Sequence, residues 1–184
     1  MNKFSIDEIS FNKFGPFTLF TGVLLILLGS GGIFLPSVVS IGTSLLVSWL
    51  LLTGGVFWAI HTYYYDSKNV MSWLKPILLF CVGGLMLFYP MTGVATIGLL
   101  LSIYLFIDSI SNFALAQAVH PAKGWGWMVV NGLTSALLAT LFLIGWPLTS
   151  LWLVGLYVSI SLLLDGWALV AIGWMLRKEQ RKEQ

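Results

Sequence analysis

The chain has 184 residues, of which 58% are hydrophobic and only 9% are charged, and its formal net charge is +2. Soluble domains carry about 25% charged residues, and a soluble protein this apolar could not cover its surface with polar groups, whereas a lipid bilayer removes that requirement. The composition therefore excludes an ordinary soluble domain, the weak charge argues against nucleic acid as a partner, and the single cysteine, Cys81, excludes an intramolecular disulfide.

The first segment, residues 1–15, is expected to be a cytoplasmic tail and not a signal peptide. Asp7 and Glu8 occupy the place of a basic n-region, and no small-residue cleavage site follows the first apolar run. Ser5 and Glu8 have the spacing of a capping box, which favours a short helix on the membrane surface. A disordered tail is the alternative.

Six long apolar runs follow the tail, and together they predict six transmembrane helices. In chain order they cover residues 17–35, 38–62, 76–89, 94–119, 127–146 and 148–176. The third run is short, but Trp73 and Leu74 extend it towards the membrane interface. The sequence therefore predicts an all-α polytopic protein with one transmembrane domain, residues 16–176, and a basic cytoplasmic tail, residues 177–184.

The connections between the runs are of two kinds. Three are short, uncharged and centred on Pro36, Pro90 and Pro147, which fits a tight turn because proline suits the first turn of a helix but not its interior. All nine Lys and Arg residues lie in the two tails or in the longer polar connections, and none lies in the proline turns. The positive-inside rule then places both termini in the cytoplasm and the proline turns outside.

The three turn prolines mark an internal repeat, because they are 54 and 57 residues apart. Small or polar residues recur at fixed distances after them. The matching sets are Ser44, Gly98 and Gly155; Ser48, Ser102 and Ser159; and Gly54, Asp108 and Asp165. Three parallel hairpin repeats, at about residues 16–66, 72–120 and 125–176, are therefore predicted, related by a pseudo-threefold axis along the membrane normal.

The repeats resemble the HdeD family of bacterial inner-membrane proteins, over roughly residues 15–176. The resembling segments are the apolar runs that end in proline, residues 22–36, 79–90 and 133–147, and the Gly- and Ser-rich helices after them, such as residues 49–55. The third repeat departs by having Thr140 where the others have glycine. The resemblance implies a six-helix fold and a role in acid resistance or general stress tolerance, and it supplies no catalytic residues.

Asp108 and Asp165 are the residues that most need explanation, because both are predicted to lie inside the hydrocarbon. An ionised acid at the centre of a membrane helix costs about 2.5–3.5 kcal/mol, and protonation or a polar partner lowers that cost. Both occupy the same repeat position, so a threefold axis would bring them to one level. Polar residues at helical spacing around them complete a candidate proton-titratable site: Tyr104, Ser111, Asn112, Asn131, Ser135 and Ser161.

Two readings of this site are open. In one, the acids line a small polar cavity and bind or transfer protons; in the other, they are neutral and hydrogen-bond one helix to the next. His61 and His120 lie near cytoplasmic helix ends without ligand partners at metal-binding spacing, and no cofactor motif is present. An enzyme is disfavoured because no serine has a nucleophile-elbow context, although paired aspartates leave an intramembrane hydrolase open.

The sequence therefore leaves three functions as alternative predictions. The first is a non-enzymatic HdeD-like stress protein. The second is a small channel or transporter for protons or a small solute, with Asp108 and Asp165 in the path. The third is a membrane assembly partner that binds a second copy or another membrane protein through glycine-lined helix faces.

Overall fold

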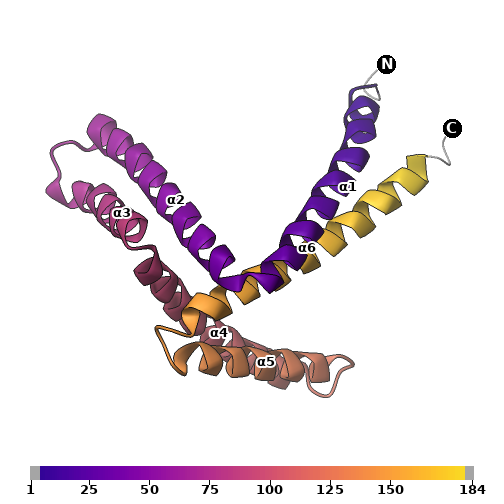
Figure 1. Cartoon of the computed structure of the whole chain (residues 1–184). Coiled ribbons are helices and arrows are strands. Elements are labelled where there is room, and N and C mark those ends of the chain that lie inside the picture. Colours follow the sequence, from indigo (N-terminus) through magenta and orange to yellow (C-terminus); the bar gives the residue numbers. More distant parts are fainter. Residues whose placement is uncertain (1–4, 181–184) are drawn as a thin grey trace. The chain divides into compact units, whose positions relative to one another are not determined.

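The computed structural model of the chain describes the backbone of residues 5–180 and the side chains of residues 17–176. Over that range every regular element is helical (Figure 1): α1 (Ser5–Phe34), α2 (Pro36–Tyr65), α3 (Val70–Phe88), α4 (Pro90–Val119), α5 (Trp125–Leu143) and α6 (Ser150–Gln180). Each helix contains an apolar window of 18 residues, which is long enough to cross a membrane. The prediction of an all-α protein with six spans is confirmed.

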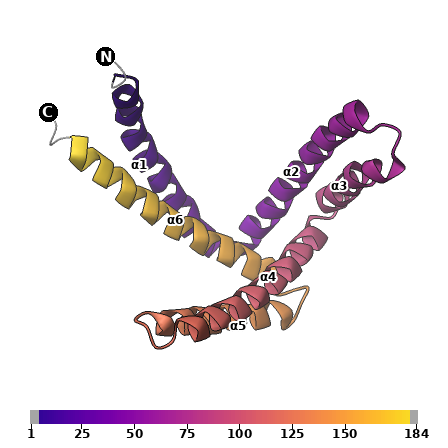
Figure 2. The same ribbon diagram turned by 180° about the vertical axis from the view of Figure 1, so that it is seen from behind.

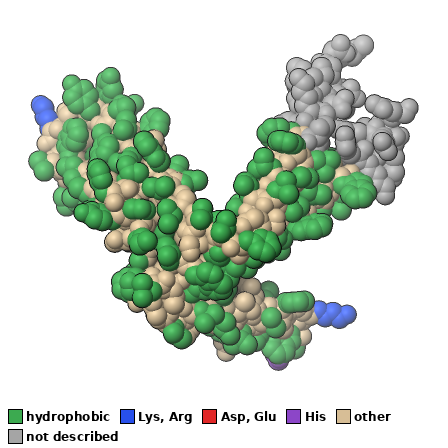
Figure 3. Space-filling view, viewed as in Figure 1, with side chains coloured by type: hydrophobic (Ala, Val, Ile, Leu, Met, Phe, Trp, Pro, Cys, Tyr) green, Lys and Arg blue, Asp and Glu red, His purple; other side chains and the backbone are tan. Residues whose placement is uncertain are grey.

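The surface of these helices is apolar where a bilayer would contact it. Figure 3 shows hydrophobic side chains over the whole length of the visible helices, with lysine or arginine side chains only at the helix ends. Large side chains such as Phe57, Leu100 and Trp127 are mostly exposed. Exposure of this kind is unfavourable in water and favourable in lipid, so the protein lies in a bilayer.

Two of the three turn prolines are the first residue of a helix. Pro36 and Pro90, predicted to lie in turns and to suit the first turn of the next helix, are the first residues of α2 and α4, which begin before the apolar runs at 38 and 94. Pro147 lies three residues before α6, because α5 ends at Leu143 and Gly145 takes a left-handed conformation with φ of 75°. The fifth apolar run therefore extends three residues beyond its helix.

The start of α3 was predicted too late. The helix begins at Val70 and contains Pro76, which had marked the start of the third apolar run. The Asn69 side chain accepts a hydrogen bond from the Met71 amide at 3.1 Å and caps the helix, so the polar loop supplies the start signal.

At the other end of the chain, the backbone of α1 is helical from Ser5 into the first span without a break. The side chains of the predicted surface helix, residues 1–15, lie outside those described.

The chain divides into two compact units. One comprises Met1–Val39 and Gly155–Gln184, and therefore holds α1 with most of α6; the other is Ser40–Val154 and holds most of α2 with all of α3, α4 and α5.

In the first unit, α1 and α6 pack closely through glycines (Figures 1 and 2). A Cβ atom at Gly22 would lie 2.9 Å from the Gly166 carbonyl oxygen, and a Cβ at Gly166 would lie 2.8 Å from the Gly22 carbonyl oxygen. The same holds along the helices, where Gly29 faces the Ser159 backbone and Gly173 faces Leu19. The two backbones are therefore in direct contact, as at small-residue crossings of membrane helices.

In the second unit, α3 packs on α2. The contact of α4 with α5 is far more extensive than the contact of α4 with α3. A Cβ at Gly83 would lie 3.2 Å from the Leu52 amide nitrogen of α2, and one at Gly132 would lie 3.3 Å from the Ser109 carbonyl oxygen of α4. The tightest contacts of this unit thus join a helix of one repeat to a helix of the next, whereas α3 and α4, joined by the turn at Pro90, have fewer mutual contacts.

One contact between successive repeats also recurs at the same pair of offsets. Ser44, eight residues after the first turn proline, packs on Gly93, three residues after the second. Gly98, eight residues after the second proline, is packed by Ser150, three residues after the third. The recurrence of one contact at the same offsets supports the predicted repeat on structural grounds.

The close approach of α1 and α6 predicts that Gly166→Leu destabilises the protein. The new side chain would meet backbone atoms of Gly22 and Ile26, which no rotamer change relieves. We expect a loss of about 1–3 kcal/mol in the free energy of unfolding, measured by denaturant titration in mild detergent.

Gly31→Leu is the control, because a Cβ at Gly31 has open space around it, and its effect should stay within about 0.5 kcal/mol. Equal effects of the two substitutions would contradict the glycine crossing.

Candidate functional site

Asp108 lies on α4 and is half-buried against α5. Its Oδ2 atom accepts hydrogen bonds from the Ser135 hydroxyl at 2.7 Å and from the Asn112 side-chain amide at 3.0 Å. The Asn131 side-chain amide in turn donates to Asn112 Oδ1 at 3.1 Å. These four residues, Asp108, Asn112, Asn131 and Ser135, form what we call the Asp108 cluster.

Helical spacing and one glycine build the cluster. Asp108 and Asn112 are four residues apart on α4, Asn131 and Ser135 are four apart on α5, and such pairs lie on one helix face. Gly132 lies between the two residues of α5, and a Cβ there would be 3.2 Å from the Asn112 Cβ. Because the helices approach so closely, the short serine and asparagine side chains reach the partner helix.

Electrostatically the cluster is an acid without a counter-charge. Among the residues with described side chains, Asp108 forms no ion pair, and its two side-chain donors, Ser135 and Asn112, are neutral. Neutral donors offset only part of the cost of holding an ion in hydrocarbon, whereas the protonated acid avoids most of that cost. The described donors to the Asp108 carboxyl are therefore neutral groups only.

Two of the predicted site residues on α4 lie away from the cluster. Tyr104 is exposed on the lipid side, and the Ser111 hydroxyl donates to the carbonyl of Ile107 in its own helix at 2.9 Å. A serine or threonine in a membrane helix commonly satisfies its hydroxyl in this way, so polarity alone did not fix which face turns inward.

The other two predicted residues, Asp165 and Ser161, belong to the first unit. The Asp165 side chain is exposed and that of Ser161 is half-buried. No hydrogen bond from either side chain is found among residues 17–176. The predicted meeting of Asp165 with Asp108 remains a prediction.

Sequence reasoning missed three buried hydroxyls. Ser40, Ser44 and Ser150 are fully buried, and their Oγ atoms have no hydrogen-bond partner among the described side chains and backbone. Serine is common in membrane helices for close packing, so the sequence offered no signal that these hydroxyls would be unsatisfied.

Of an aromatic cluster on α2 that contacts Lys75, sequence reasoning identified only His61. His61 stacks on Tyr65 with ring centroids 4.7 Å apart, and Trp58 meets His61 edge-on at 5.5 Å. The Lys75 ammonium lies 3.3 Å from the centroid of the Trp58 ring. The three- and four-residue spacing of Trp58, His61 and Tyr65 was the available signal for the aromatic part, while Lys75 comes from another helix.

The sequence matches the family described as a short repeat of unknown function (DUF308) twice, over residues 20–78 and 74–144. The chain belongs to the DUF308 family. This is the family of HdeD-like membrane proteins, so the resemblance is confirmed at family level. The two matches begin 54 residues apart, the interval that separates Pro36 from Pro90, and the Asp108 cluster lies in the second. No curated protein and no solved structure matches the chain.

A double-mutant cycle measures the bond from Ser135 to Asp108 in this DUF308 protein. From the unfolding free energies of Asp108→Ala, Ser135→Ala and the double variant, we expect a coupling of about 0.6 kcal/mol, with an upper bound of about 1.7 kcal/mol.

Thr134→Ala provides the matched cycle, because the Thr134 hydroxyl donates to Val130 in its own helix and not to Asp108. Its coupling with Asp108→Ala should be near zero. Equal couplings in the two cycles would show that the bond between Ser135 and Asp108 does not hold the helices together.

Proposed function

We propose that this protein is an HdeD-like component of a bacterial inner membrane that supports acid resistance or general stress tolerance, and that it acts without catalysis through a proton-binding site at Asp108. The observation that carries the proposal is the Asp108 carboxyl between α4 and α5, which takes hydrogen bonds from Ser135 and Asn112. The physiological role rests on the resemblance to the HdeD family, with which membership of the DUF308 family agrees.

The proton would act on the contact between α4 and α5. When Asp108 is ionised, the bonds from Ser135 and Asn112 are charge-assisted and therefore roughly twice as strong as neutral ones. A proton on the carboxyl removes the charge and weakens both bonds. Since Ser135 is on α5 and Asp108 is on α4, acidification loosens one of the polar links between these helices, which gives the protein an acid-dependent change of state.

The geometry favours a non-catalytic role. Among the described side chains, the one hydroxyl bonded to the Asp108 carboxyl, that of Ser135, is only 6% exposed. A nucleophile needs access to a substrate carbonyl or phosphorus, and so buried a hydroxyl is poorly accessible to a substrate.

Survival after an acid challenge tests the proposal in a bacterial host that lacks its own HdeD-like protein. Wild-type protein should raise survival above the empty vector, and Asp108→Asn should not, because the amide keeps the shape of the carboxyl but cannot take up a proton. Tyr104→Phe is the control, since Tyr104 faces lipid and should be dispensable. Protection by Asp108→Asn at equal protein level would refute a proton-binding role.

A second candidate function is proton movement across the membrane. It is favoured by the continuity of the cluster, in which hydrogen bonds run from buried Ser135 through Asp108 and Asn112 to exposed Asn131. In proteoliposomes under a pH gradient, a proton pathway would give flux well above that of empty liposomes. That flux should disappear in the Asp108→Asn/Asp165→Asn double variant. No flux from folded wild-type protein would remove this candidate and leave the first in place.

The proposed orientation has both termini in the cytoplasm, supported by the position of every Lys and Arg outside the proline turns. In a Cys81→Ala background, a membrane-impermeant maleimide should label Met91→Cys, next to a proline turn, in intact cells. Lys68→Cys, in the connection between α2 and α3, should be labelled only after permeabilisation. The reverse pattern would invert the topology.

A further inference from the structure

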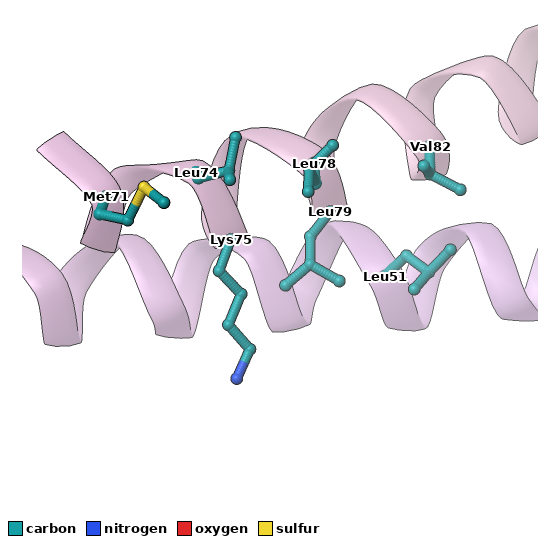
Figure 4. A pocket seen from close by; sticks show the side chains of 7 residues that line it. All are labelled: Leu51, Met71, Leu74, Lys75, Leu78, Leu79 and Val82. Atoms are coloured by element: carbon teal, nitrogen blue, oxygen red, sulfur yellow. The ribbon is translucent and has the colours of Figure 1, made fainter.

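A groove of about 340 Å³ runs along the contact between α2 and α3. Six apolar side chains and one lysine line it, as Figure 4 shows: Leu51, Met71, Leu74, Lys75, Leu78, Leu79 and Val82. All except Leu51 come from one face of α3. The groove is therefore apolar along its length and carries a single charge.

The charge lies near the loop end of the groove. Lys75 is five residues into α3, and Figure 4 shows its side chain crossing towards α2 while the apolar side chains continue along α3. The Trp58 ring of α2 holds the ammonium at 3.3 Å from its centroid. A cation–π contact occupies one side of an ammonium and leaves N–H groups for an acceptor.

No carboxylate neutralises this lysine within residues 17–176. The nearby loop contains Asp66, but its Oδ2 atom accepts hydrogen bonds from the Ser72 hydroxyl at 2.5 Å and from the Asn69 amide at 3.3 Å. The acid of the loop is thus used to hold the loop and the start of α3. Lys75 therefore forms no ion pair among the described residues, and its ammonium is complementary to an anion.

The apolar lining continues along α3 beyond the lysine. From Lys75 to Val82 the helix rises about 10 Å at 1.5 Å per residue, which is about two thirds of one leaflet of a hydrocarbon core of ~30 Å. A ligand that combines a negative group at one end with an apolar chain fits both properties.

We propose that this groove binds one anionic phospholipid, with the headgroup phosphate on Lys75 and an acyl chain along Leu74, Leu78 and Val82. The lysine stem contributes to the lining of the groove, while its ammonium, held at the Trp58 ring, keeps the charge that attracts an anionic headgroup. The site is on α2 and α3, whereas the Asp108 cluster is on α4 and α5, so it stands independently of the proposed function.

Lipid binding to the full-length protein, counted by native mass spectrometry from mild detergent, tests the site. The probes are phosphatidylglycerol and phosphatidylcholine of equal chain length. We expect wild-type protein to bind the first phosphatidylglycerol more tightly than phosphatidylcholine. Lys75→Gln should reduce that affinity about fivefold, the ratio given by ~1 kcal/mol per interfacial lysine. Lys75→Arg should retain the preference.

Two matched controls separate this site from general attraction to lipid. Lys123→Gln removes a lysine from the connection between α4 and α5 and should leave the preference unchanged. Leu78→Trp fills the groove without touching the charge and should weaken phosphatidylglycerol binding, whereas Leu100→Trp on an exposed face of α4 should not. Equal binding of the two lipids by wild-type protein, or an undiminished preference in Lys75→Gln with unchanged circular dichroism, would overturn the proposal.

Discussion

Close approach between helix backbones is the condition on which the rest of this structure depends. In a bilayer no hydrophobic force drives helices together, because lipid tails are as apolar as leucine, so association relies on dispersion contacts and hydrogen bonds at short range. The Gly22–Gly166 crossing meets that condition in one unit, and Gly83 and Gly132 meet it in the other. Each of these contacts would be lost if a larger side chain separated the backbones.

The Asp108 cluster follows from the same condition. Serine and asparagine have short side chains, and Ser135 reaches Asp108 only because Gly132 allows α5 to lie against α4. The packing and the chemistry of this site are therefore coupled: a larger residue at 132 would remove the acid's partner as well as the contact. Stability and the hydrogen bonding of Asp108 cannot be varied independently at this position.

The sequence was sufficient for features that depend on composition and on backbone stereochemistry. Apolar length gave the six spans, and the fixed φ of proline gave the starts of α2 and α4. It was insufficient where the answer depends on which side of a helix faces inward, because helices in lipid are apolar all round. Hence Asp108, Asn112, Asn131 and Ser135 were assembled as predicted, while Tyr104 and Ser111 were placed in the same site and lie outside it.

The recurring contact of Ser44 with Gly93, and of Ser150 with Gly98, joins non-identical positions of neighbouring repeats. An interface of this head-to-tail kind is heterologous, and heterologous interfaces build rings or open chains of separate subunits. A single hairpin contains both positions of this contact, the third and the eighth residue after its turn proline. Such a hairpin can therefore associate with copies of itself. In the present chain, loops join the hairpins covalently. The contact therefore forms within one molecule, at an effective concentration in the millimolar range, and the number of associated hairpins is fixed.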